Sequence, residues 1–410
     1  MHYTPLDEFS KSKWSLSSFS TRKLRLRIAT VAMLMVVAVL LWTQAPPIPL
    51  AYYRGRLPFN KASTQESPEG EVSSSQELHG KEHSTQDSHV RGIPSEDLAT
   101  FARHAINNTV VIVPVNTGML QFAENLLCSL EAISFDTSDL VFWALDEGAK
   151  RALDSKNRTT YYDSRLWSVS SDENKHGNTG DYRRMMKERP WFFIDLLSAG
   201  YDMLMLDADI VFWRSPLLLV PNKNEKVDIV YSTDARDFYT EHNAFDDARR
   251  RGDLFPPICN GLFWMRSSKD NIGLWSHMLD VFESTDPETQ NFRDNVFMDD
   301  QRGMDVMLND KGRAKIVEPY PEGITQDMLP AENNNATLNV RLLDQTEVAN
   351  GQLVMFHEKK YLKKLAKLRA TGKERIAVHM NWDTGAVTKE DGAKQKNIWY
   401  WDGEKCKYPK

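Results

Sequence analysis

LMLDADIVFW, residues 204–213, sets two carboxylates, Asp207 and Asp209, into a run that is otherwise apolar. An apolar run of this length predicts a buried strand. Buried carboxylates that lack partners are costly, so a cation, a basic group or a ligand is expected beside this pair. The residues after Asp209 are Ile, Val, Phe and Trp. Because these are not turn-forming residues, the sequence favours a chain that stays extended through the pair over a hydrated turn.

Asp207 and Asp209 are two positions apart, so on a strand their side chains point to the same side. Two carboxylates placed about 6 to 7 Å apart along the backbone can converge on one divalent cation. Such a cation can bridge the oxygens of a diphosphate and stabilise the charge on a departing nucleoside diphosphate. Because Asp-x-Asp also occurs by chance, the remainder of the chain has to decide its meaning.

The length of 410 residues, with 41% hydrophobic and 26% charged residues, is ordinary for a globular protein with one large or two medium domains. The formal net charge is -6. After residue 30 the sequence has no block of Lys and Arg interleaved with aromatic residues. We therefore expect no nucleic-acid partner.

The N-terminus contains an uncharged apolar run at residues 28–43, preceded by several Lys and Arg residues. This order predicts a cytosolic tail (1–27), a transmembrane signal anchor (28–43) and a body on the far side of the membrane. A cleaved signal peptide is the alternative. The long leading region and the lack of a small-x-small cleavage site favour the anchor.

A flexible stem is predicted over residues 44–100, because Ser, Glu, Gln and Gly replace branched and aromatic residues there. Its histidines, among them His89, are expected to be solvated. Asn107, Asn157 and Asn335 begin N-glycosylation sequons, which suit a lumenal body. The catalytic domain is expected at residues 105–405.

The three cysteines are too few for a disulfide framework, and their odd number leaves at least one thiol unpaired within the chain. Cys128 lies in an apolar helical pattern. A bridge between Cys259 and Cys406 therefore remains an open alternative.

The globular part alternates strand and helix patterns. Strands are predicted at 109–116, 140–146 and 227–234, short strand-like pieces at 314–319, 338–344 and 352–357, and helices at 119–133, 147–155, 181–200 and 271–284. The third helical region is expected to be interrupted near Pro190 and closed by Gly200. This order implies a parallel sheet covered on both faces, with the acidic pair at the end of the third or fourth strand. Ligands bind beyond such strand ends.

One alternative is a phosphohydrolase of the haloacid-dehalogenase type. Its Asp-x-Asp-x-Thr/Val pattern is satisfied by residues 207–211, and its first Asp acts as a nucleophile. That motif normally opens its domain, whereas here two strand-helix units precede it. Gly252 and Asp253 match the expected later loop poorly.

Several segments together resemble nucleotide-diphospho-sugar transferases of the GT-A type, and most closely glycosyltransferase family 77. They are residues 110–130, 144–146, 196–217, 259–268, 299–308 and 379–382. The resemblance implies a GT-A, Rossmann-like α/β domain with a mixed central sheet. It also implies a nucleotide-sugar donor, expected to be UDP-linked, Mn²⁺ or Mg²⁺ as cofactor, retention of anomeric configuration, and a glycan or glycoprotein acceptor. A Golgi membrane protein of type II topology is expected.

The resemblance further implies residue roles. Asp207, Asp209 and His379 would hold the metal. The nucleotide pocket would be lined by Val115, Asn116, Thr117 and Asp146. Arg184 and Lys187 could reach the diphosphate or ribose, or simply form a solvated basic helix face.

On the sugar side, Asn260 and Gly261 would lie near the donor sugar. Asp299 and Asp300 precede Gln301 in an acidic-Gln segment, and one of the two acids would act as base, electrostatic partner or hydroxyl anchor. The alternative for these two acids is an ordinary helix N-terminus. Trp264 and Trp382 are candidates for stacking on sugar rings.

Two polar segments, residues 170–179 and 238–257, are expected to form acceptor loops or lids. They leave the acceptor open. An inactive lumenal glycan-binding protein that keeps the fold is the third reading of the sequence.

Overall fold

The acidic pair follows β4 (Asp202–Leu206), a buried strand at the centre of the domain. The computed structural model of the chain describes residues 89–165, 180–241, 255–297, 299–310, 312–326, 329, 335–381 and 386–408. The predicted tail, signal anchor and most of the predicted stem lie outside these residues, as do the segments 170–179 and 242–254. Within the described ranges, no helix combines the length and apolar character that a membrane crossing requires.

The main sheet has eight strands in the order β3-β2-β1-β4-β7-β6-β9-β8. Only β7 runs antiparallel to its neighbours, so the sheet is mixed. The family resemblance predicted a mixed sheet, and this is confirmed. The parallel sheet predicted from the order of strands and helices is wrong. The strands besides β4 are β1 (Thr109–Val115), β2 (Leu140–Ala144), β3 (Thr160–Tyr161), β6 (Ile229–Thr233), β7 (Ile258–Met265), β8 (Ala314–Ile316) and β9 (Leu338–Leu342). Because β1, β2 and β4 are parallel, the loops after them meet at one edge of the sheet.

The chain does not stay extended through the acidic pair, so that prediction is wrong. β4 ends at Leu206, and a turn at Ala208 and Asp209 leads into β5 (Ile210–Phe212). β5 belongs to a second sheet of order β10-β11-β5, with β10 (Val348–Asn350) and β11 (Ala377–His379). The apolar residues after Asp209 are therefore the core strand of another sheet, and the turn is buried rather than hydrated.

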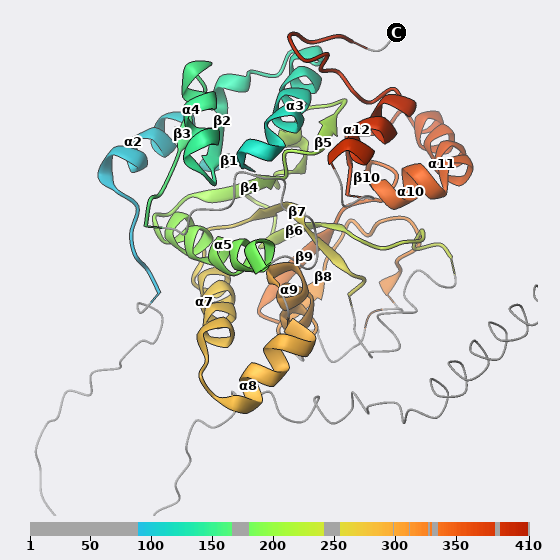
Figure 1. Cartoon of the computed structure of the whole chain (residues 1–410). Coiled ribbons are helices and arrows are strands. Elements are labelled where there is room, and N and C mark those ends of the chain that lie inside the picture. Colours follow the sequence, from blue (N-terminus) through green and yellow to red (C-terminus); the bar gives the residue numbers. More distant parts are fainter. Residues whose placement is uncertain are drawn as a thin grey trace, which may run out of the picture. The chain divides into compact units, whose positions relative to one another are not determined.

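Helices cover both faces of the main sheet. Figure 1 shows α3 and α4 on one side and α5 and α7 on the other. The helices are α2 (Ser95–His104), α3 (Leu120–Ala132), α4 (Glu147–Ser155), α5 (Gly180–Ser198), α7 (Lys269–Glu283), α8 (Pro287–Phe292), α9 (Asp300–Leu308), α10 (Gly351–Phe356), α11 (Glu358–Ala370) and α12 (Ala386–Gln395). Short 3-10 helices occupy Thr117–Met119, Thr137–Asp139 and Pro216–Leu219, and a π-helical turn occupies Arg293–Phe297.

Two local predictions of secondary structure are wrong. α5 continues through Pro190, because the buried aromatic face that follows it is held against α7 and outweighs one missing hydrogen bond. The strand expected at 352–357 is the short helix α10, which begins because the Asn350 side chain caps it by accepting from the Leu353 amide. Gly200 does close α5, with a φ of 91°.

The ordered domain begins earlier than predicted. α2 lies inside the expected stem, and His89 is buried rather than solvated, with its ring nitrogen 2.7 Å from a carboxylate oxygen of Asp280. The backbone amides of Arg91 and Gly92 donate to Asp195 of α5. Residues 89–104 are therefore part of the folded domain.

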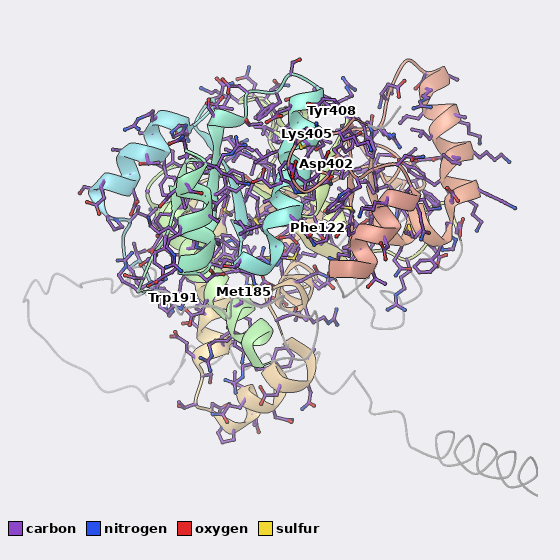
Figure 2. All side chains as sticks on the ribbon, turned by 45° about the horizontal axis from the view of Figure 1, so that its top comes forward. Phe122, Met185, Trp191, Asp402, Lys405 and Tyr408 are labelled. Carbon is purple, nitrogen blue, oxygen red and sulfur yellow. A yellow bond between two sulfur atoms is a disulfide. The ribbon has the colours of Figure 1, made fainter. Side chains whose placement is uncertain are left out.

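Cys128 is bonded to Cys406, and Cys259 is a free, buried thiol, so the Cys259–Cys406 alternative is wrong. The bridge joins α3 to the C-terminal tail. Figure 2 shows Asp402, Lys405 and Tyr408 of this tail along α3, whose Phe122 is labelled near them. The tail also follows α12 directly, so the bridge fixes the end of the segment that carries α12.

Replacing Cys406 by serine tests this bridge. The partly exposed Cys406 is the better partner to change, because Cys128 lies in the core. Loss of a bridge across 278 positions is expected to cost roughly 2–4 kcal/mol and lower the melting temperature by about 5 °C. Differential scanning fluorimetry under non-reducing conditions measures the shift. An unchanged melting temperature would contradict the role given to the bridge.

Candidate active site

A cavity of about 350 Å³ opens at the strand edge where the acidic pair lies. Its walls come from the loops after β1, β2, β4 and β6, from β7 and β11, and from α5, α9, α10 and α12. Eight sequence-predicted residues line it: Val115, Asn116, Asp207, Asp209, Asn260, Gly261, Asp300 and His379. Segments far apart in the sequence therefore meet in one place, as expected for ligand binding beyond parallel strand ends.

Asp207, Asp209 and His379 form the centre of this cavity. The His379 Nε2 atom is 3.0 Å from Asp209 Oδ1 and 3.6 Å from Asp207 Oδ2. Each of the three residues offers one ligand atom, and these atoms lie within 4.8 Å of one another. Two carboxylate oxygens and one imidazole nitrogen at this spacing are donors that suit Mn²⁺ or Mg²⁺.

The second ring nitrogen of His379 faces away from the acids. Nδ1 lies 3.3 Å from the Cys259 sulfur. A proton on Nδ1 leaves the Nε2 lone pair directed at the carboxylates, which is the tautomer that a metal ligand needs. The β7 thiol therefore helps to orient the histidine.

The charges of this centre are strongly linked. Burial alone would raise the pKa of Asp209, but Lys389 and His379 outweigh it and hold that pKa well below its usual range. The Lys389 ammonium lies 2.5 Å from Asp209 Oδ2. Burial would lower the pKa of His379, yet the Asp209 carboxylate raises it well above its usual value. A divalent cation would replace this proton, because it neutralises the same carboxylates.

Gly261 allows Asp207 and His379 to lie close to the β7 backbone. Its carbonyl accepts from the Asp207 amide at 2.7 Å. A Cβ atom at this position would lie 2.3 Å from the His379 ring and 2.4 Å from an Asp207 carboxylate oxygen. Only glycine fits there without moving a member of the acidic centre.

The nucleotide side of the cavity is built from the loops after β1 and β2. Val115 and Asn116 line the cavity, whereas Thr117 and Asp146 are not among its lining residues. The Asp146 carboxylate caps α4 and accepts from both the amide and the hydroxyl of Thr117 at 2.7 and 2.6 Å. These two predicted binding residues thus join the β1 and β2 loops to each other.

A buried ion pair occupies the opposite wall. Asp300 is fully buried, and its carboxylate is 3.5 Å from Arg189 Nε. Arg189 also donates to the Asn260 carbonyl at 2.9 Å. Burial raises the pKa of Asp300 to about 6, although Arg189 opposes the shift.

Asp299, the neighbour of Asp300, does not line the cavity. Its side chain accepts from the Arg302 amide and caps α9. The helix N-terminus alternative therefore holds for Asp299, whereas Asp300 faces the site. Arg184 and Lys187 also do not line the cavity: Arg184 is exposed, and Lys187 lies over the Phe282 ring. Trp264 is a core residue, and Trp382 is outside the described residues.

Sequence reasoning missed several residues of the cavity wall. Arg189 lies on the buried face of α5, four positions before Phe193, and a cation within an apolar stripe is a signal that could have found it. Lys389 had no such signal, because its position depends on where α12 packs. The other missed polar residues are Asp234, Arg236, Gln301, Gln352 and Asn381. Gln301 was noted only as part of its motif.

Asp300 and Asp299 make a matched pair for mutation. Asp300→Asn is expected to lower kcat/KM at least about 100-fold, because it leaves Arg189 buried beside an uncharged amide. Asp299→Asn should stay within about twofold, because asparagine also caps helices. Comparable losses in both variants would contradict this assignment.

The pH profile gives a second readout of Asp300. The wild-type rate should fall as pH drops through about 6, where the carboxylate takes up a proton. A raised folded-state pKa means that this same proton favours the folded state, so stability from this group increases as pH falls toward the unfolded value. An acid limb in activity without loss of melting temperature is the expected combination. Asp300→Asn should remove that limb from its residual rate.

The mixed sheet and the acidic centre at its strand edge define an α/β fold of the GT-A type with a candidate nucleotide-sugar site. Residues 137–392 match the family described as nucleotide-diphospho-sugar transferase. The chain belongs to this family. The Asp-Asp-His cluster is then in keeping with the divalent metal that transferases of this fold commonly use.

The chain is similar to several individual proteins, but at low sequence identity. The chain is 22% identical over 320 residues to a UDP-galactose:fucoside alpha-3-galactosyltransferase of Dictyostelium discoideum. This match covers 72% of the chain but only 43% of that relative. Mouse xyloside xylosyltransferase 1 is similar at 12% identity and a TM-score of 0.38, covering 67% of this chain and 98% of that one. The galactosyltransferase LgtC is similar at 13% identity and a TM-score of 0.38, covering 72% and 97%.

Proposed function

We propose that this protein transfers a sugar from a nucleoside diphosphate donor, with UDP as the expected nucleotide, to a hydroxyl of a glycan or glycoprotein. The observation that carries the proposal is the convergence of Asp207, Asp209 and His379 in a cavity walled by the β1 and β2 loops. Family membership supports a nucleotide-sugar donor. The galactosyltransferase relative is named for a UDP-linked donor, which supports UDP.

In this proposal Asp207, Asp209 and His379 hold Mn²⁺ or Mg²⁺. The bound cation would neutralise the donor diphosphate and stabilise it as a leaving group. Val115 and Asn116 would contact the nucleoside, since they stand where the first strand of the sheet ends.

Two basic groups of the wall serve the same proposal. Lys389 is the cation nearest to the acidic centre and would face the diphosphate charge. Arg189 and Asp300, fixed by their ion pair, would hold hydroxyls of the donor sugar. Retention of anomeric configuration is part of the proposal and rests on the resemblance to family 77.

We also propose that the domain is lumenal, on a Golgi protein of type II topology with the anchor at 28–43. The Cys128–Cys406 bridge supports an oxidising compartment. Asn107, Asn157 and Asn335 are all exposed, as glycosylation requires. A phosphohydrolase is the less favoured reading, because the family match covers the acidic pair within a transferase.

Release of nucleoside diphosphate from a panel of nucleotide sugars tests the proposed function. The purified full chain should release diphosphate from one donor with Mn²⁺, and chelation by EDTA should reduce that rate at least about 100-fold. Addition of a suitable sugar acceptor should increase the rate. Release from no donor, together with hydrolysis of a generic phosphate ester, would favour the phosphohydrolase. If neither assay detects activity and the protein binds glycans, the hypothesis of an inactive glycan-binding protein would be favoured.

A further inference from the structure

The segment of α11 and its following loop, residues 358–375, is strongly basic. It holds eight Lys and Arg residues against Glu358 and Glu374, a local charge of +6 in a chain whose net charge is -6. Tyr361 is its one aromatic residue, so it is not the block of basic and aromatic residues whose absence argued against a nucleic-acid partner. Figure 1 places α11 at the outer edge of the domain, beyond α10.

Some of these cations are paired with the body of the domain. Lys360 lies 2.9 Å from Glu241, and Lys364 lies 2.7 Å from Glu322. Lys359, Lys363 and Lys367 differ from these: they are exposed, and no ion pair to them occurs among the residues that the structure describes. These three lysines are therefore the exposed cations of α11 that have no ion pair within the described residues.

The three lysines follow one another at intervals of four positions on one helix. Like charges at this spacing repel and destabilise a helix. Exposed helix faces commonly relieve such repulsion with acids, but here the residues three positions after each lysine are Leu362, Ala366 and Ala370. Unrelieved repulsion between like charges lowers helix stability, and such locally unfavourable surfaces are expected at binding sites.

Apolar side chains adjoin this basic face. Leu362 is 52% exposed, and Phe356 at the end of α10 is 67% exposed. They are two of only five large hydrophobic side chains exposed in the described part of the chain. The opposite face of α11 is already committed to the core through Tyr361 and Leu365. An interfacial membrane helix needs that apolar face for insertion, so a lipid surface fits α11 poorly.

The spacing of the lysines fits an extended polypeptide. Four residues of helix advance about 6 Å. Alternate side chains of an extended strand are about 6.6 Å apart and point the same way. Acidic residues at every second position of an extended peptide can therefore meet successive lysines, while Leu362 and Phe356 offer apolar contact.

The basic face is connected to the candidate active site. Gln352, in the first turn of α10, lines the cavity, and Phe356 lies one helical turn further on. α11 begins two positions after Phe356. A chain that lies along α11 and passes Phe356 would lead toward the cavity.

We propose that the stripe formed by Lys359, Leu362, Lys363 and Lys367, together with Phe356, binds an extended acidic segment of the acceptor polypeptide. The proposal rests on the proposed function only in naming the acceptor as the source of that segment. The surface would select glycoprotein acceptors whose glycosylated hydroxyl has alternating acidic residues near it. Its contribution would be to acceptor affinity rather than to the chemical step.

A fluorescein-labelled peptide of alternating Glu and Ser tests the proposal by fluorescence anisotropy with the full chain. The triple variant Lys359→Gln, Lys363→Gln, Lys367→Gln removes like-charge repulsion, so it should fold at least as well as the wild type. Its Kd for the peptide should rise at least about tenfold. The matched variant Lys223→Gln, Lys405→Gln, Lys407→Gln changes the net charge equally at other exposed sites and should stay within about twofold. A Gln-Ser peptide should not bind.

Three outcomes would overturn the proposal. The first is equal peptide affinity in the two triple variants, or no binding to the wild type. The second is binding of anionic phosphatidylglycerol vesicles that depends on the three lysines while the peptide does not bind. The third is peptide affinity that increases at least about tenfold when the six acids within residues 66–87 are changed to their amides, which would make the chain's own segment the occupant. Donor turnover without acceptor, measured in parallel, reports separately on the proposed function.

Discussion

Asp209→Asn is expected to abolish metal-dependent release of nucleoside diphosphate, with a loss of about 1,000-fold or more in kcat/KM. The change keeps the shape of the side chain but removes the charge that pairs with both His379 and Lys389. It removes one of the three proposed metal ligands, and it leaves an ammonium and an imidazole facing a neutral amide. The steady-state rate at saturating Mn²⁺ is the measurement.

Stability has to be measured on the same variant, because a buried charge pair is broken. Removing one partner of such a pair can cost about 3–5 kcal/mol, although Lys389 is partly exposed and can turn to solvent. We therefore expect a lowered melting temperature but a folded protein at 25 °C. Asp299→Asn is the matched control, because it makes the same chemical change just outside the cavity. A folded Asp209→Asn that keeps more than about a tenth of the rate would contradict the assignment of the metal centre.

Gly261→Ala is the second change for which a large effect is expected. The added methyl would lie 2.3 Å from His379 and 2.4 Å from Asp207, so at least one of these two proposed metal ligands has to move. Overpacking of this kind costs about 1–3 kcal/mol of stability. Displacement of metal ligands is costlier for function, and we expect the affinity for Mn²⁺ to fall at least about tenfold and kcat/KM at least about 100-fold. Titration calorimetry and the diphosphate-release assay measure the two effects.

Gly148→Ala provides a control of similar steric severity. Its methyl would lie 2.4 Å from the Thr117 hydroxyl and 2.9 Å from Asp146, on the nucleotide side rather than at the acidic centre. This variant should weaken donor binding while the affinity for Mn²⁺ in the absence of nucleotide stays within about twofold. Equal losses of metal affinity in both glycine variants would mean that crowding acts through general stability.

Much of the fold could be predicted, because the early strand-helix units carry uninterrupted apolar runs of the right lengths. β1 and α3 match their predicted positions closely. The same reasoning failed at Asp209, where the apolar run was assigned to one strand. It is divided between two sheets by a buried turn, and periodicity alone cannot show on which sheet a strand lies.

The site was predictable wherever its residues follow a strand or belong to a motif. Asp207 and Asn260 are of this kind. Lys389 and Arg189 were missed for a different reason. The position of Lys389 depends on α12, which is held by a tail bonded to Cys128 across most of the chain. Arg189 was missed because the resemblance points to Arg184 and Lys187 as the ligand-facing cations of α5, whereas the buried Arg189 lines the cavity.

The proposed function requires Asp207, Asp209 and His379 to bind a divalent cation together with the donor diphosphate. Electron paramagnetic resonance of free Mn²⁺, titrated with the full chain with and without UDP, tests it most directly. We expect one bound Mn²⁺ per chain, an affinity that UDP increases at least about tenfold, and loss of that binding in Asp209→Asn. Binding of Mn²⁺ that is equal in the wild type and in Asp209→Asn, or no binding even with UDP, would contradict the claim.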